Sequence, residues 1–398
     1  MRRISGALLL AAMWGCSKDG PPTQPQLGLG KAAQSNPSSY AIVKLPTLGG
    51  TSRGDGINDR GWVAGFSNLP GNTIRHATLW QDGSILDLGT LGGPNSSVVW
   101  PGINNQGTIA GISETAALDP LGESWSCSAF FPTGTGHICL GFVWDAGVMT
   151  ALPTLGGNNG FATGVNSRGQ VVGWAETPVH DPTCNAPQVL QFRAVLWEPR
   201  KGLTTQLSPL PGDSTSAATA INNRGQVVGI SGTCDVAVGE FSAAHAVLWD
   251  KGTVTDIGNL GGVAWNTPMA INASGDVVGF SDPPGDADGS FIAHAFLWTR
   301  KSGIADLGTL PGDDISEALS INARGQIVGL SCGAAGCRAF IWQDGTMIDL
   351  NTLAGPGYPD NLISAQDIND AGRITGRVRE QSTGRTLAFV ATPVPNAP

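Results

Sequence analysis

Charged side chains are scarce in this chain: only 13% of the 398 residues are Asp, Glu, Lys or Arg, and the net charge is −9. No run of Lys and Arg is longer than two residues. The sequence therefore offers no basic face that could neutralise phosphates, which excludes nucleic acid as the expected partner.

Two local signatures of catalysis are also missing. The sequence has no His-Glu-x-x-His pair and no phosphate-binding loop. This argues against an enzyme, but it leaves an alternative open, because an active site can be assembled from residues of distant repeats. No cofactor is expected.

Glycine and proline, in contrast, are abundant, with 57 Gly and 26 Pro residues. Both residues weaken helices, and tight turns between short strands use them readily. Because 41% of the residues are hydrophobic, the chain can still bury a core. The composition favours an all-β domain over a helical or disordered chain.

The first sixteen residues are typical of an export signal. Arg2 and Arg3 precede an apolar segment, 4–13, that is too short to span a bilayer. The step from Gly15 to Cys16 resembles the cleavage site of bacterial lipoproteins, in which the cysteine becomes the lipidated N-terminus. We therefore expect lipidation at Cys16, and membrane contact only through that lipid.

Two features qualify the destination of the exported chain. Met13 and Trp14 depart from the usual lipobox, so ordinary secretory cleavage, giving a secreted or periplasmic protein, stays an alternative. Ser17 rather than Asp after the cysteine favours the outer membrane or cell surface. Residues 17–39 are rich in Pro, Ser, Gln and Gly, which is typical of a solvated tether.

One pattern recurs seven times along residues 40–392. An Ile-Asn or Val-Asn step marks each copy, at Asn58, Asn104, Asn166, Asn222, Asn272, Asn322 and Asn369. A Trp step follows at Trp80, Trp144, Trp197, Trp249, Trp298 and Trp342, with Val390 in the seventh place. The spacing runs from 46 residues (Asn58 to Asn104) to 62 residues (Asn104 to Asn166), which suits a four-stranded propeller blade.

Each copy divides into four short strands, which we call a to d. Strand a ends at Ile-Asn, and Asn-x-x-Gly is a tight-turn signal. Strand b is Gly-x-Val-Val-Gly, strand c carries Ala-x-Leu-Trp, and strand d is Ile-x-Asp-Leu. A Leu-Gly-Gly or Leu-Pro-Gly crossover leads to the next copy.

The chain ends predict that the repeats close into a ring. Residues 40–48 match strand d but precede the first strand a, and the last copy stops without a strand d of its own. The N-terminal strand can therefore complete the last blade, which removes exposed sheet edges. We predict an all-β, seven-bladed propeller. Its blades cover 51–91, 94–155, 158–210, 213–260, 263–310, 313–353, and 356–392 plus 40–48, with 393–398 as a tail.

The repeat resembles the HAF repeat of predicted bacterial extracellular proteins, which is named after a His-Ala-Phe step. That step is complete at His294 and partial at His76 and His245. The resemblance extends over nearly all of residues 40–392. It implies an exported location, and it implies no particular reaction.

Six cysteines follow the lipidation cysteine, and an even number in an exported protein favours disulfides. All six lie in loops between strands b and c. Repeat register predicts Cys127–Cys139 within blade 2 and Cys332–Cys337 within blade 6. Cys184 and Cys234, on adjacent blades, remain for a third pair by elimination.

Polar residues within the repeat are expected to be structural. Arg193 and Arg338 replace the repeated His in two copies, and Arg cannot bind a metal ion. The strand-d Asp and the repeated Asn are expected to bond backbone N–H groups near turns. A weak Ca²⁺ alternative remains in one loop, whose carboxylates are Asp282, Asp286 and Asp288.

The b–c loops differ in length between blades. From the last Gly of strand b to the His place, blades 2 to 5 use 15 to 30 residues and blades 1, 6 and 7 only 9 to 11. The face that carries these loops also gathers aromatic residues outside the repeat. The ligand-binding candidates among them are Trp100, Trp125, Phe161 and Trp265. The alternative is that these rings pack beneath the loops as a satellite core.

These observations predict an exported binding or scaffold module. We expect a monomer that recognises a cell-surface protein or an extracellular glycan through the long loops of blades 2 to 5. One alternative is a polysaccharide hydrolase or lyase with its site in the central funnel, for which carboxylates clustered at the funnel mouth would be required. Another is a purely structural surface protein that self-associates.

Overall fold

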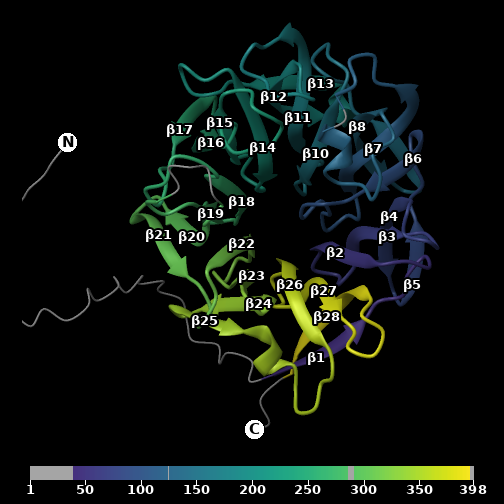
Figure 1. The fold of residues 1–398 in the computed structure, drawn as a ribbon, viewed down its shortest axis with the longest axis vertical. Coiled ribbons are helices and arrows are strands. Elements are labelled where there is room, and N and C mark those ends of the chain that lie inside the picture. Colours follow the sequence, from purple (N-terminus) through teal and green to yellow (C-terminus); the bar gives the residue numbers. More distant parts are fainter. Residues whose placement is uncertain (1–38, 124, 286–290, 395–398) are drawn as a thin grey trace, which may run out of the picture.

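Seven four-stranded antiparallel sheets are arranged in a ring (Figure 1). The computed structural model describes residues 39–123, 125–285 and 291–394. The predicted export signal, Cys16 and residues 17–38 of the tether lie outside the described residues. The protein is therefore an all-β, seven-bladed propeller, as the repeat predicts. No helix in the described ranges is long and apolar enough to cross a membrane.

Each blade consists of strands a to d, with strand a innermost. Blade 1 comprises β2(Ser52–Ile57), β3(Val63–Asn68), β4(Arg75–Gln81) and β5(Ser84–Asp87). Blade 2 comprises β6(Gly92–Ser97), β7(Ile109–Leu118), β8(His137–Asp145) and β9(Val148–Ala151). Blade 3 comprises β10(Gly160–Val165), β11(Val171–His180), β12(Leu190–Glu198) and β13(Leu203–Leu207). Blades 4 and 5 comprise β14(Thr215–Ile221), β15(Val227–Gly232), β16(His245–Asp250) and β17(Thr253–Asp256); and β18(Thr267–Ile271), β19(Val277–Ser281), β20(His294–Thr299) and β21(Gly303–Gly308). Blade 6 comprises β22(Ile315–Ile321), β23(Ile327–Gly333), β24(Gly336–Gln343) and β25(Thr346–Asp349). Short helices interrupt the loops at α1(Trp125–Ser128), η1(Pro199–Lys201) and η2(Leu350–Leu353).

The seventh blade combines the first and the last described strands, which lie side by side at the bottom of Figure 1. It contains β26(Asn361–Ile368), β27(Ile374–Arg379), β28(Thr386–Val394) and the N-terminal β1(Ser39–Lys44). β1 pairs with β28 over its whole length, from Ser39 opposite Val394 to Lys44 opposite Phe389. The predicted closure by an N-terminal strand is confirmed.

Strand b of each blade is buried between its neighbours, which explains its β-branched and glycine residues. All six residues of β15 are buried. A bulge between Ala218 and Ala220 brings strand a close to Gly229. A Cβ at Gly229 would lie 2.0 Å from the Ala217 carbonyl oxygen, so only glycine fits there.

The repeated Asn residues form a complete ring of hydrogen bonds between blades. The Nδ2 of Asn58 donates to the Asn104 carbonyl at 3.1 Å, and each following Asn donates to the next. Asn369 donates to the Asn58 carbonyl at 2.9 Å and completes the circle. The Asn side chains also close their own turns: Asn104 Oδ1 accepts the N–H groups of Gln106 and Thr108 at 3.0 Å. The predicted turn role is confirmed, and the link between blades adds to it.

Two salt bridges of Lys44 also stabilise the closed ring. Lys44 lies 2.9 Å from Asp360 and 2.6 Å from Glu380, both in blade 7. The repeated Trp of blade 1, Trp80, donates its indole N–H to the Pro46 carbonyl at 2.7 Å. β1 is therefore fastened to both the last and the first blade.

Candidate functional site

One face of the propeller carries all the long connections. The b–c loops of blades 2 to 5 are 119–136, 181–189, 233–244 and 282–293, whereas those of blades 1, 6 and 7 are 69–74, 334–335 and 380–385. The d–a crossovers emerge on the same side, because neighbouring strands of a blade run in opposite directions. We call this side the long-loop face, and the opposite side, which carries the Asn ring, the turn face.

Three disulfides secure the long-loop face, and all three pairs are those predicted from the sequence. Cys127–Cys139 lies within blade 2 and Cys332–Cys337 within blade 6, with Cα atoms 5.8 and 4.0 Å apart. Cys184–Cys234 joins the loops of blades 3 and 4. Disulfides of this number are typical of proteins that fold in an oxidising compartment outside the cytoplasm.

Aromatic side chains form a layer beneath the loops of blades 2 to 4. Edge-to-face contacts link Trp100, Phe130, Phe161 and Trp174, with ring centroids 4.9 to 6.4 Å apart, and Phe192 extends the layer. Phe161 is fully buried and Trp100 is 7% exposed. Of the two alternatives stated for these rings, the satellite core describes both of them: they pack beneath the loops and present no open face to a sugar.

The other two predicted rings differ from these. Trp265 is half-buried and stands edge-on to Phe291, with centroids 5.4 Å apart. Trp125 belongs to the backbone of α1, but its side chain lies outside the described part of the structure. Trp265 is therefore not a fully exposed aromatic platform.

The exposed apolar side chains of the long-loop face are found on blades 2 to 5. Leu118 is 67% exposed and Leu121 40%, both at the blade 2 loop. Val179 of blade 3, Phe241 of blade 4 and Val263 at the start of blade 5 are 49%, 46% and 60% exposed. Each residue lies in a long loop, at the edge of one or in a crossover. The exposed apolar side chains therefore lie on the same blades as the longer b–c loops.

The proposed Ca²⁺ loop is only partly described. Asp282 is buried, and its Oδ1 accepts the Ile292 N–H at 3.3 Å. Asp286 and Asp288 lie outside the described residues. Within the described ranges, no group of three or more His, Cys, Asp or Glu side chains is arranged to hold a metal ion.

Buried glutamates hold the loops of blades 2 and 3 in place, and the repeat pattern did not indicate them. Glu176 accepts from the Asn159 N–H at 2.8 Å and the Gln188 amide at 3.0 Å. Glu123 accepts the Leu190 N–H at 2.5 Å. Burial, and then the charge of Glu123, raises the pKa of Glu176 to about 7. The two carboxyl groups hold the loops in place by accepting hydrogen bonds from them, and these hydrogen bonds offset the cost of burying the carboxyl groups.

A second charged group lies in the channel wall of blades 6, 7 and 1. Arg53 Nε lies 2.6 Å from Asp55 Oδ1, as an ion pair rather than an aligned hydrogen bond. Arg75 stacks on the ring of Phe66. Arg377 interacts electrostatically with Arg53 and Asp55, and Glu317 interacts with Arg53. Burial raises the pKa values of Asp55 and Glu317 to about 7 and lowers that of Arg377 to about 10. Neither the repeated His nor the repeated Asp pointed to these residues.

The turn face holds a cavity of about 240 Å³ that the Asn ring surrounds. Asp367 lies in its wall, where it accepts hydrogen bonds from the Ile57 N–H at 2.7 Å and the Ser320 hydroxyl at 2.5 Å. Burial raises the pKa of Asp367 to about 6. Its hydrogen bonds make Asp367 a link between blades 1, 6 and 7.

The His of the HAF step pairs with the strand-d Asp of its own blade. The Nδ1 of His76 lies 2.7 Å from Asp87, and the corresponding distances at His245 and His294 are 3.1 and 2.9 Å. The hydrogen bond to Asp87 raises the pKa of His76. The same Asp accepts the Gly89 N–H at 2.8 Å, which confirms the predicted turn contact.

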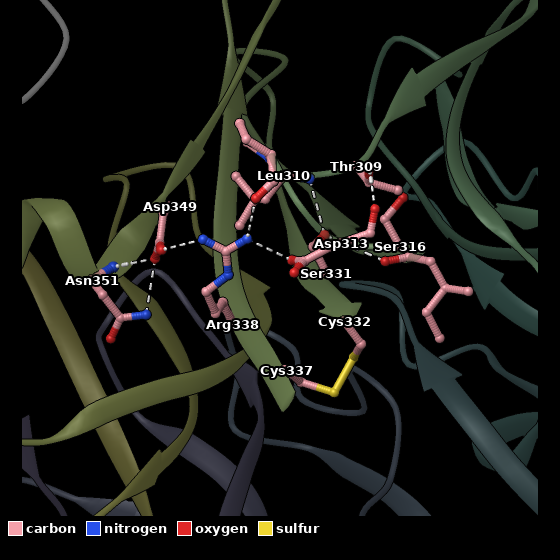
Figure 2. Close-up of polar contacts among 12 residues, drawn as sticks. Thr309, Leu310, Asp313, Ser316, Ser331, Cys332, Cys337, Arg338, Asp349 and Asn351 are labelled. Atoms are coloured by element: carbon pink, nitrogen blue, oxygen red, sulfur yellow. Dashed lines mark hydrogen bonds and ion pairs between the residues drawn. A yellow bond between two sulfur atoms is a disulfide. The ribbon is translucent and has the colours of Figure 1, made fainter. Parts of the chain in front are cut away.

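In blade 6 an arginine takes the place of the His and connects two acidic side chains. Figure 2 shows Arg338 between Asp349 and Asp313, beside the Cys332–Cys337 disulfide; the nitrogen–oxygen distances are 3.1 and 2.9 Å. This pair fixes strands c and d to the preceding crossover. In four blades, the side chain at the His position of the repeat therefore pairs with the strand-d Asp of its own blade. This pairing supports a structural role for that position.

Comparisons with known proteins report on the fold. No protein-family model and no curated protein matches the sequence. Among solved structures, the chain is similar to a gluconolactonase from Xanthomonas campestris (12% identity, TM-score 0.38, covering 92% of this chain and 99% of that one). It is also similar to an oligogalacturonate lyase from Vibrio parahaemolyticus, with 11% identity and a TM-score of 0.46, covering 89% of this chain and 94% of that one. A third similar structure is an acylaminoacyl peptidase from Pyrococcus horikoshii, with 11% identity and a TM-score of 0.48, covering 85% of this chain and 50% of that one.

Proposed function

We propose that this protein is an exported, non-catalytic binding module that recognises a partner protein through the long-loop face of blades 2 to 5. A lipid on Cys16 holds it at the outer membrane, and residues 17–39 act as the tether. Membership of the HAF-repeat proteins is part of this proposal, because the repeat carries that family's His-Ala-Phe step.

The exposed apolar set on the long loops carries the proposal. Leu118, Val179 and Phe241 stand on three successive blades, each at least 46% exposed. Apolar side chains on a rigid support are typical of protein interfaces, since burying them releases water without ordering a flexible chain. The Cys184–Cys234 disulfide provides such support. The burial of Trp100 and Phe161 supports a protein partner over a glycan.

The test measures saturable binding of the chain from residue 17 onward to cell-envelope fractions. The variant Leu118→Asp is compared with Val148→Asp, a matched control on the outer strand of the same blade that is 63% exposed. The proposal predicts loss of binding in Leu118→Asp only, and only in fractions that retain intact protein. Binding that survives protease but not periodate would transfer the site to a glycan, and binding unchanged in both variants would contradict the proposal.

Cleavage of a polysaccharide in the channel is the second candidate function. Asp55 and Glu317 favour it, because carboxyls with pKa values of about 7 can exchange protons near neutral pH. Incubation with acidic and neutral polysaccharides, followed by reducing-end and unsaturated-product assays, tests this function. Product that disappears in Glu317→Gln would establish it, and absence of product with every substrate would reject it.

A further inference from the structure

Arg53 and Glu317 occupy the same level of the channel wall, five residues before the ring asparagine of their blades. Asn58 follows Arg53 and Asn322 follows Glu317 at this spacing. By strand register, the residues at the corresponding level of strand a in the other blades are Ser97, Phe161, Ala217, Thr267 and Ser364. The wall is therefore apolar or small at this level, except where blades 6 and 1 place opposite charges.

Arg377 joins this level from strand b of the blade between them. It pairs in register with Ser364, whereas the residues at the corresponding strand-b places are Phe66, Ile112, Trp174, Ile230, Phe280 and Leu330. Ser364, which pairs with Arg377 in register, has a short side chain. Three neighbouring blades thus bring Arg53, Arg377 and Glu317 together at one height.

The two arginines differ in how they are held. Arg53 has Asp55 at 2.6 Å and the Val99 carbonyl at 3.5 Å. The Nε of Arg377 is buried without a hydrogen-bond partner among the described residues. Arg75, in contrast, donates to the Phe130 carbonyl at 2.6 Å and to Asn68 Oδ1 at 3.0 Å. A buried guanidinium without a partner is costly, and an oxyanion is the partner that its planar fork fits best.

The charges around this level do not balance. Arg53, Arg75 and Arg377 contribute three positive charges against the two carboxyls of Asp55 and Glu317. Arg53, Arg377 and Glu317 all keep part of their surface open to solvent. The excess positive charge is therefore partly accessible to an anion in solution.

We propose that Arg377 and Arg53 form a binding site for the oxyanion group of a small organic ligand, such as the carboxylate of a sugar acid. Arg377 contacts the oxyanion with its free N–H groups, and Arg53, fixed by Asp55, contacts it from the next blade. Glu317 borders the site and opposes the negative charge, which limits affinity. This site is independent of the protein-binding surface, since it lies in the channel wall and uses none of the exposed apolar residues.

Calorimetric titration of the chain from residue 17 onward tests the proposal. The probes are glucuronate, its uncharged counterpart glucose, and inorganic sulfate and phosphate. We expect saturable binding of glucuronate and none of glucose, with Arg377→Gln weakening it by about tenfold or more. Arg338→Gln, which removes a rim arginine outside the channel, is the matched control and should leave binding unchanged. Binding of sulfate or phosphate but not glucuronate would assign the oxyanion to a free inorganic ion and overturn the organic ligand.

A variant that gains affinity separates ligand binding from loss of folding. Glu317→Gln removes the opposing charge, so glucuronate should bind about threefold to tenfold more tightly. A misfolded variant cannot produce this result. Weaker or unchanged binding in Glu317→Gln, or no binding of any oxyanion by the unmodified protein, would overturn the proposal. Melting of ligand-free Arg377→Gln adds a structural readout: a binding role predicts an unchanged or raised midpoint, and a structural role predicts a lowered one.

Discussion

Replacing a single asparagine of the ring should destabilise the whole propeller. The side chain of Asn104 makes three hydrogen bonds: it accepts the N–H groups of Gln106 and Thr108 and donates to the Asn166 carbonyl, all at 3.0 Å. Each bond contributes about 1 kcal/mol net, and buried groups left unpaired cost more. Asn104→Ala loses all three bonds and should lower the free energy of unfolding by about 3 to 5 kcal/mol.

Urea unfolding followed by tryptophan fluorescence measures this loss. Asn104→Asp keeps both acceptor contacts but loses the donor to Asn166, so it should cost about 2 kcal/mol at pH 7, less than the alanine variant. Asn259→Ala is the control, because that exposed turn asparagine makes only a local contact to the Gly261 N–H. A cost below about 1 kcal/mol for Asn104→Ala would refute the idea that the ring stabilises the fold.

Three further predictions concern closure, pH and the loop disulfide. Deleting residues 40–48 should lower the melting temperature of the domain in one cooperative calorimetric transition, and an unchanged profile would contradict the closed ring. The raised pKa of Glu176 means that its protonation stabilises the folded state fully below pH 4.5 and that this contribution disappears as the pH rises through about 7. Urea unfolding between pH 5 and pH 8 should therefore show stability falling by about 1 to 3 kcal/mol from this group, and Glu176→Gln should flatten the profile; an equally steep profile would contradict the assignment. Replacing Cys184 and Cys234 by serine should cost about 2 to 4 kcal/mol in the same assay, and no cost would mean that the disulfide does not constrain the loops.

The fold could be predicted from the sequence because the same pattern occurs seven times in it. Repetition fixes the strand order within a blade, and the displaced strand at residues 40–48 fixes how the ring closes. The Asn of each turn was predictable from its Gly partner. Its bond to the next blade was not, because a sequence does not say which carbonyl a side-chain amide meets across an interface.

The His–Asp pairs leave a trace in the sequence. Asp accompanies His at His76, His245 and His294, and accompanies Arg338, but the copies with Gly141 or Thr386 lack it. Two repeat positions that change together indicate contact. The pairing of strands c and d can therefore be recognised by aligning the seven copies of the repeat with one another.

The channel site could be predicted only in part. Arg53 and Glu317 stand out among seven equivalent positions, so repeat alignment can find them. Arg377 joins them through strand register and blade geometry, which the alignment does not contain. For Trp100 and Phe161 the sequence left burial as one of two alternatives, because an aromatic residue near a loop can lie above or beneath it.

Binding to the cell envelope by a face variant and a control variant tests the central claim most directly. The face variant combines Leu118→Asp, Val179→Asp and Phe241→Asp, and the control places Asp at Val148 and Leu203, two outer-strand positions with 63% and 52% exposure. With folding verified by melting, the account predicts that the control binds envelope protein with unchanged affinity and that the face variant loses saturable binding. Equal binding by both variants would contradict recognition through the long-loop face.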